Sequence, residues 1–199
     1  MSSRFVSALR KVVRALQSEG FTPVIVGTYA LILQGWLPED YIVETKDIDI
    51  YIPSPDVLVA IATTGSRLLE ELEREGFIVS LHATGGVEVV ALGVDKPIEI
   101  LYPIADIYIP RVLLEEVVVI EGLRVLEAHA VLVAKMLGEE YSLMRVASIL
   151  KERRAPVDVY RLIYLAERAE RELRDMGDDV LASKLSRRAE RVVGYLRLG

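Results

Sequence analysis

The sequence predicts an α/β fold of the α+β kind, in which a mixed β-sheet is flanked by helices and followed by a helical C-terminal domain. Strand-like and helical stretches alternate up to Leu126, and one of them forms a strand, a turn and a helix in succession from Thr22. After Leu126 apolar residues recur at helical spacing to the end of the chain. We therefore expect a core domain over residues 1–126 and a helical domain over residues 127–199.

The composition suits a packed protein and excludes several kinds of site. Of the 199 residues, 52% are hydrophobic and 27% are charged, which leaves little room for long disorder. Cysteine is absent, which excludes disulfides and a cysteine nucleophile, and the two histidines argue against a histidine-rich zinc site. No apolar run approaches the roughly 20 residues that span a bilayer, and the N-terminus favours an amphipathic helix over a signal peptide, so we expect a cytoplasmic protein.

Charge is distributed unevenly along the chain. Asparagine is absent and charged residues are abundant, which favours a thermophilic source. The net charge is -6, yet the segment from Val180 to Gly199 is mainly basic. This segment either forms a solvated helix face or contacts RNA, and both interpretations stay open at this point.

The first half of the chain predicts helices and strands in alternation. Arg4 to Glu19 should form an amphipathic helix that ends at Gly20. One or two helices should fill Asp56 to Glu75, with Gly65 as the expected break. Between these lie a strand from Thr22 to Val26, a turn and helix from Gly27 to Leu33, a loop from Gly35 to Glu44, and a strand from Asp47 to Ile52 that Pro53 ends.

The second half predicts strands first and helices afterwards. Pro156 suits the first turn of one helix, and Gly177 suits the gap before the next. Gly85-Gly86 suggests a hairpin turn between two strands. The expected strands are Phe77 to His82, Val87 to Leu92, Ile98 to Tyr102, Val117 to Ile120 and Leu123 to Leu126.

The strongest functional signal is a pair of aspartates in the stretch TKDIDIYI. Asp47 and Asp49 flank Ile48, and residues two apart on a strand share a face, so both carboxylates should point the same way while the isoleucines point into the core. Two carboxylates on one face bind hard cations such as Mg²⁺, with Mn²⁺ as an alternative ion. The ordinary alternative is a strand whose polar face meets water.

Two further features fit the same chemistry. Gly27 and Thr28 stand where a strand feeds a helix, and backbone amides there suit a phosphate, although an ordinary capped turn has the same sequence. Glu99, between two isoleucines, is the best candidate for a third metal ligand, with Asp95 and Glu88 as weaker choices. A solvated strand glutamate is the alternative for Glu99.

With these residues the chain resembles the DNA polymerase β-type nucleotidyltransferase superfamily. The stretches GTYALILQGW and TKDIDIYI are similar to its AbiEii toxin-like branch of minimal nucleotidyltransferases. The resemblance implies that Asp47, Asp49 and Glu99 ligate Mg²⁺ and act in catalysis, and that Gly27 and Thr28 hold the triphosphate. The chain departs from the family pattern in Thr28, in the long loop before the aspartates and in a glutamate as third acid.

The same branch implies two nucleotide-binding residues in the helical domain. Lys135 in AHAVLVAKML and Asp158 in APVDVYRL resemble its lysine and later aspartate. A lysine that extends to solvent and an acid in the first turn of a helix are the alternatives.

The implied function is transfer of a nucleoside monophosphate from an NTP, such as ATP, to an RNA, protein or small-molecule acceptor. The alternatives are an inactive nucleotide-binding or regulatory protein of a toxin-antitoxin-like system, with a protein partner of the antitoxin type, and an RNA-binding module that uses the basic tail.

Overall fold

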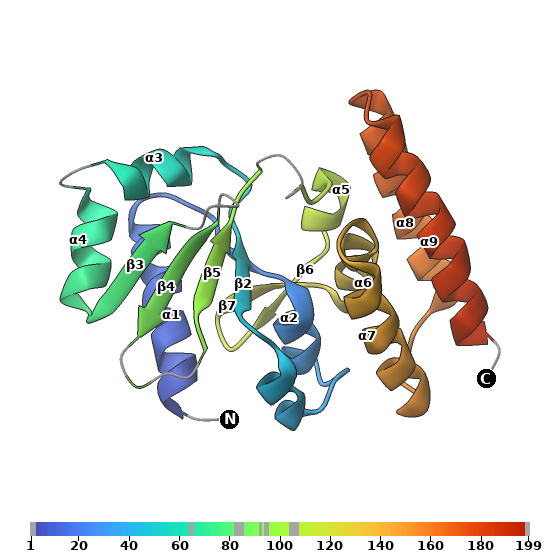
Figure 1. Cartoon of the computed structure of the whole chain (residues 1–199), viewed down its shortest axis with the longest axis horizontal. Helices are drawn as coiled ribbons and strands as arrows, with labels where there is room; N and C mark the ends of the chain where they lie inside the picture. Colours follow the sequence, from blue (N-terminus) through green and yellow to red (C-terminus); the bar gives the residue numbers. More distant parts are fainter. Residues whose placement is uncertain are drawn as a thin grey trace. The chain divides into compact units, whose positions relative to one another are not determined.

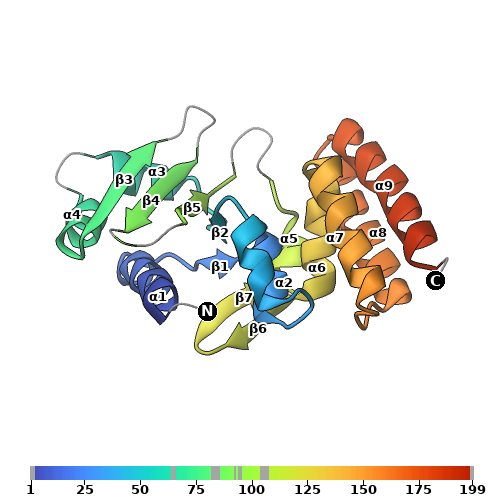
Figure 2. The same cartoon turned by 60° about the horizontal axis from the view of Figure 1, so that its bottom comes forward.

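The computed structural model describes residues 3–63, 66–81, 86–91, 93, 96–103 and 108–197, with side chains from Val6 onward. Contacts group the chain into two compact units, which Figures 1 and 2 draw from two directions. The first unit comprises Met1–Tyr29, Glu39–Tyr108 and Val119–Val125, and the second comprises Ala30–Pro38, Ile109–Val118 and Leu126–Gly199. Two segments of the second unit precede residue 126, and the division into domains at residues 126 and 127 stays a prediction.

Seven strands of the described residues form one sheet in the order β3-β4-β5-β2-β1-β7-β6. Strand β2 runs parallel to β5 and antiparallel to β1, while β1 runs parallel to β7. The predicted mixed sheet is therefore confirmed. The strands are β1 (Val24–Ile25), β2 (Ile48–Tyr51), β3 (Phe77–Leu81), β4 (Val87–Ala91), β5 (Ile98–Leu101), β6 (Val117–Ile120) and β7 (Leu123–Leu126).

Alternation of side chains explains how β2 and β5 sit in the sheet. Ile48 and Ile50 of β2 are fully buried, and Asp49 between them is only half-buried. The same pattern recurs in β5, where isoleucines flank Glu99. Burial of each isoleucine contributes about 1.5–3 kcal/mol, so the apolar face fixes the orientation of the strand and turns both acids to the opposite face.

The helices of the first unit pack on one another and on the sheet. These are α1 (Ser3–Ser18), α3 (Asp56–Ala62) and α4 (Arg67–Arg74). Leu9, Val12 and Leu16 follow the helical repeat along α1 and are fully buried. Helix α4 begins where the Ser66 Oγ accepts a hydrogen bond from Leu69 N–H, and it packs against β3 and α1. In Figure 1 α1 passes behind strands β3 and β4.

The second unit is mainly helical, as predicted. Helix α2 (Gly27–Leu33) begins in the first unit and ends in the second. The apolar residues that recur at helical spacing along α8 are buried, namely Leu162, Leu165, Ala166, Ala169 and Leu173. The helices of this unit are α5 (Arg111–Leu114), α6 (Ala128–Leu137), α7 (Glu140–Glu152), α8 (Val159–Asp175) and α9 (Asp179–Arg197).

The basic residues of α9 make contacts within the protein. Lys184 Nζ donates to the Leu137 carbonyl at 2.6 Å, and Arg188 Nη1 donates to the Met136 carbonyl at 2.9 Å. Arg191 pairs with Glu140 on α7. The last carbonyls of a helix lack partners within the helix, and cations are favoured there, so Lys184 and Arg188 fasten α9 to the end of α6. RNA contact is not needed to explain them.

Several local expectations differ from the structure. The segment expected as a loop before β2 contains a 3-10 helix, Glu39–Glu44, and the short helix α5 was not expected. Pro156 precedes α8 instead of lying in its first turn, because the helix begins at Val159 after Asp158 has capped it. His82 and Gly85, which belong to the expected strand and hairpin turn, lie outside the described residues. A search of the described helices finds none with the length and apolar character of a membrane span.

Candidate active site

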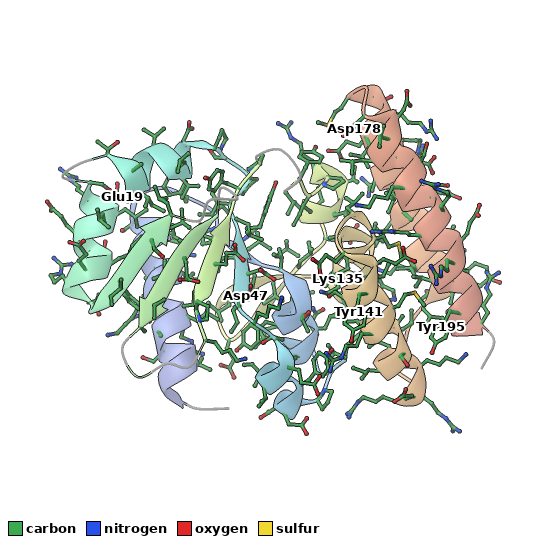
Figure 3. The ribbon with its side chains drawn as sticks, viewed as in Figure 1. Glu19, Asp47, Lys135, Tyr141, Asp178 and Tyr195 are labelled. Carbon is green, nitrogen blue, oxygen red and sulfur yellow. The ribbon has the colours of Figure 1, made fainter. Side chains whose placement is uncertain are left out.

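Three carboxylates from adjacent strands lie together in the first unit. Asp49 on β2 and Glu99 on β5 are register partners in the parallel pair, and Asp47 directly precedes β2. One carboxylate oxygen from each of the three acids lies within 4.8 Å of the others. All three residues are half-buried. Figure 3 labels Asp47 at the start of β2.

The glycine turn lies directly against this group. Gly27 has φ +66°, a left-handed conformation that glycine adopts without strain. A Cβ at this position would overlap the Asp49 Oδ2 atom and would lie 3.0 Å from Asp49 Cγ. The Val26 N–H donates to the Asp49 carbonyl at 3.0 Å, which holds the end of β1 beside β2. Glycine is therefore required here for its backbone angle and for its lack of a side chain.

The start of α2 differs slightly from the expected capped turn. Gly27 and Thr28 are the first two residues of the helix, and both are half-buried. The next residue, Tyr29, is buried, and its burial, assisted by the charges of Glu121 and Glu39, raises the pKa of its hydroxyl far above the ordinary value. The Tyr29 side chain therefore stays neutral at any ordinary pH.

Of the weaker candidates for a third acid, the one within the described residues, Glu88, does not join the group. Glu88 on β4 is the register partner of Glu99, but the cluster of three acids does not include it. The Ser80 hydroxyl donates to Glu88 Oε1 at 3.4 Å. Asp95 lies outside the described residues.

A second glycine, Gly86 directly before β4, lies close to the group. A Cβ built on Gly86 would lie 2.6 Å from Glu99 Oε1. The sequence suggested only a hairpin turn for this glycine. No sequence pattern signals the contact, because it depends on the register between β4 and β5.

Lys135 and Asp158 belong to the second unit, whereas the three carboxylates belong to the first. Lys135 is half-buried on α6, where Figure 3 labels it, and its Nζ donates to the Ser142 hydroxyl at 3.3 Å. Asp158 is the N-cap of α8, because its Oδ1 accepts from the N–H groups of Tyr160 and Arg161. Nucleotide binding by these two residues stays a prediction.

A buried polar network in the second unit was not foreseen. His129, 6% exposed, contacts Glu127 Oε1 through Nδ1 at 2.7 Å, and its Nε2 accepts from the Asp158 N–H at 3.0 Å. The second bond requires an unprotonated Nε2, so Nδ1 carries the proton and donates to Glu127. Burial alone would raise the pKa of Glu127. The hydrogen bond from His129 and the charge of Arg161 have the larger combined effect, and together they hold the pKa of Glu127 below its ordinary value. This network ties the start of α6 to the start of α8.

The donor set in the first unit suits a divalent metal. Carboxylate oxygens are the preferred ligands of Mg²⁺ and Mn²⁺, and the described ligands are oxygens without competing sulfur. The acids are only half-buried, so water and phosphate oxygens can complete the coordination. Three negative groups this close repel one another, and a cation relieves the repulsion.

Comparison with known proteins agrees with the geometry. The sequence model of a family described as nucleotidyl transferases of unknown function, DUF2204, matches residues 5–179. No curated protein matches the chain. Among solved structures, the antibiotic-resistance factor ANT(2'')-Ia in solution is 15% identical, covering 83% of this chain and 90% of that chain with a TM-score of 0.50. This likeness supports the fold.

Two crystal structures are similar at lower scores. ANT(2'')-Ia in complex with adenylyl-2''-tobramycin is 16% identical, covering 94% of this chain and 99% of that chain with a TM-score of 0.46. JHP933 from Helicobacter pylori is 17% identical, covering 99% of this chain and 95% of that chain with a TM-score of 0.43.

Proposed function

The chain belongs to the DUF2204 family of nucleotidyl transferases, and we propose that it is an active, metal-dependent enzyme. It would transfer a nucleoside monophosphate from an NTP to a hydroxyl or phosphate oxygen of an acceptor and release pyrophosphate. The observation that carries the proposal is the grouping of Asp47, Asp49 and Glu99 beside the Gly27 turn.

The proposed reaction forms one bond and breaks one. The acceptor oxygen bonds to the α-phosphorus, and the bond from that phosphorus to the oxygen shared with the β-phosphate breaks, so the electron pair leaves with pyrophosphate. A bound Mg²⁺ would supply positive charge to offset the charge that builds up on the triphosphate. Asp47 and Asp49 would hold the metal, and Glu99 would complete the ligand set and accept the proton when the acceptor is a hydroxyl.

The glycine turn fits the triphosphate for two reasons. Gly27 begins α2, whose first N–H groups have no partner within the helix, and its missing side chain lets this backbone lie directly against the Asp49 carboxylate. Thr28 adds a hydroxyl in the first turn. Lys135 and Asp158 remain proposed contacts of the nucleotide, with Lys135 as the phosphate partner and Asp158 bonding through the oxygen that does not cap α8.

Transfer is tested by incubating the full chain with each α-labelled NTP, Mg²⁺ or Mn²⁺, and pools of RNA, protein or small-molecule acceptors. We expect label transfer by the wild type and a loss of at least about a hundredfold in the Asp47→Asn, Asp49→Asn double variant. The matched pair Glu99→Gln and Glu88→Gln separates the two neighbouring acids of β5 and β4, and only Glu99→Gln should inactivate. Nucleotide binding without transfer to any acceptor would support the regulatory alternative instead.

A further inference from the structure

We propose that Gly86 is a positioning residue that keeps the Glu99 carboxylate within reach of the metal. The proposal rests on the proposed function of the three acids. Gly86 directly precedes β4 and lies two residues before Glu88, the register partner of Glu99. It is therefore a diagonal neighbour of Glu99 on the same face of the sheet.

Space, and not backbone conformation, requires glycine at this position. The φ of Gly86 is not among the positive values, so an L-residue would meet no strain from the backbone there. A Cβ would, however, lie 2.6 Å from Glu99 Oε1 and 3.5 Å from its Cδ and Cγ. Only the carboxylate oxygen is too close, which means that the contact concerns the end of the side chain.

The length of Glu99 explains why this space is needed. A glutamate carries its carboxylate one methylene farther from the strand than an aspartate would. In the structure the extra reach brings Glu99 Oε1 to within 2.6 Å of the place where a Cβ of Gly86 would lie. One carboxylate oxygen of Glu99 also lies within 4.8 Å of an oxygen of each aspartate. The glycine directly before β4 and the glutamate on β5 therefore form a matched pair.

The consequence of adding a methyl group follows from the flexibility of the glutamate. The side chain of Glu99 can rotate away, so Gly86→Ala should leave the free energy of unfolding nearly unchanged while it moves the carboxylate away from the metal site. Loss of a group that orients a metal ligand typically lowers metal affinity by about tenfold to a hundredfold. In the double variant Gly86→Ala, Glu99→Asp, the shorter acid removes the overlap. Its metal affinity should therefore return to that of Glu99→Asp alone.

The test is titration of Mn²⁺ alone into the full chain, followed by electron paramagnetic resonance, with thermal unfolding measured in parallel. The variants are Gly86→Ala, Glu99→Asp, the double variant, and Gly194→Ala as a control, because Gly194 has no positive φ and nothing within 4 Å of its added Cβ. We expect weaker Mn²⁺ binding by Gly86→Ala and a Mn²⁺ affinity of the double variant within about threefold of that of Glu99→Asp. The Mn²⁺ affinity of the control Gly194→Ala should equal that of the wild type.

The outcomes separate this role from the proposed function. Unchanged Mn²⁺ affinity in Gly86→Ala, or a double variant whose losses simply multiply, overturns the positioning role alone. Mn²⁺ binding by the wild type without nucleotide transfer overturns the proposed activity and leaves the positioning role standing. A wild type that binds no Mn²⁺ overturns both.

Discussion

Replacing Gly27 by alanine perturbs the closest approach between the glycine turn and the three acids. The new methyl group meets two obstacles in the structure: the backbone at φ +66° and the carboxylate of Asp49. The left-handed conformation costs an alanine about 1–2 kcal/mol. The lower entropy of the unfolded alanine chain offsets about 0.4–1 kcal/mol of this, which leaves a net loss near 1 kcal/mol from the backbone.

The contribution of Asp49 is isolated by a second glycine. Gly20 has φ +84°, and a Cβ at that position would meet nothing within 4 Å. Gly20→Ala therefore carries the backbone cost without a clash, and it should unfold with a free energy about 1 kcal/mol below that of the wild type. In Gly27→Ala the carboxylate of Asp49 must move in addition, and with it a proposed ligand of the metal.

Urea unfolding with and without Mn²⁺ measures both effects. A metal at a concentration of 100 times its dissociation constant stabilises the wild type by about 2.7 kcal/mol. Gly20→Ala should keep this gain, because its substitution lies away from the acids, whereas Gly27→Ala should lose most of it. If Gly27→Ala shows the same gain as Gly20→Ala, the turn does not hold the metal ligand in place and the reasoning is refuted.

Three further predictions concern charge. Asp47→Asn should raise the unfolding free energy of the metal-free protein by about 1 kcal/mol, because it removes repulsion between carboxylates whose oxygens lie within 4.8 Å of one another. The same variant should lose the stabilisation by Mn²⁺. A metal-free variant less stable than the wild type contradicts this reasoning. Arg188→Met should lose about 1–2 kcal/mol in urea unfolding, since its guanidinium bonds the Gly138 carbonyl at the end of α6, whereas Arg187→Met, whose partner is a carbonyl of its own helix, should be nearly neutral. The pKa of Glu127 is lowered in the folded state, so its ionised carboxylate adds to the free energy of unfolding above the ordinary pKa of 4.5. This contribution is lost as the pH falls through the folded-state pKa. On acidification Glu127→Gln should therefore lose less free energy of unfolding than the wild type.

Local sequence patterns were sufficient for much of the fold and for placing the acids on one face of the sheet. The alternation of isoleucines with acids predicted that Asp49 and Glu99 share a face of the sheet, because side chains on a strand alternate wherever the strand lies. The apolar repeat of α8 predicted its buried stripe for the same kind of reason. Both patterns depend on neighbours in the chain, which is why one sequence reveals them.

Other features depend on residues far apart in the sequence. Asp49 lies beside Glu99 because β2 and β5 pair in parallel with these two residues in register, and a shift of one residue would have separated their side chains. The contact of Gly86 with Glu99, like the bond between His129 and the Asp158 N–H, likewise arises only when distant segments pack. The residue types of the candidate site can thus be read from local periodicity, whereas the room around each carboxylate is set by strand register and by the backbone that lies next to it.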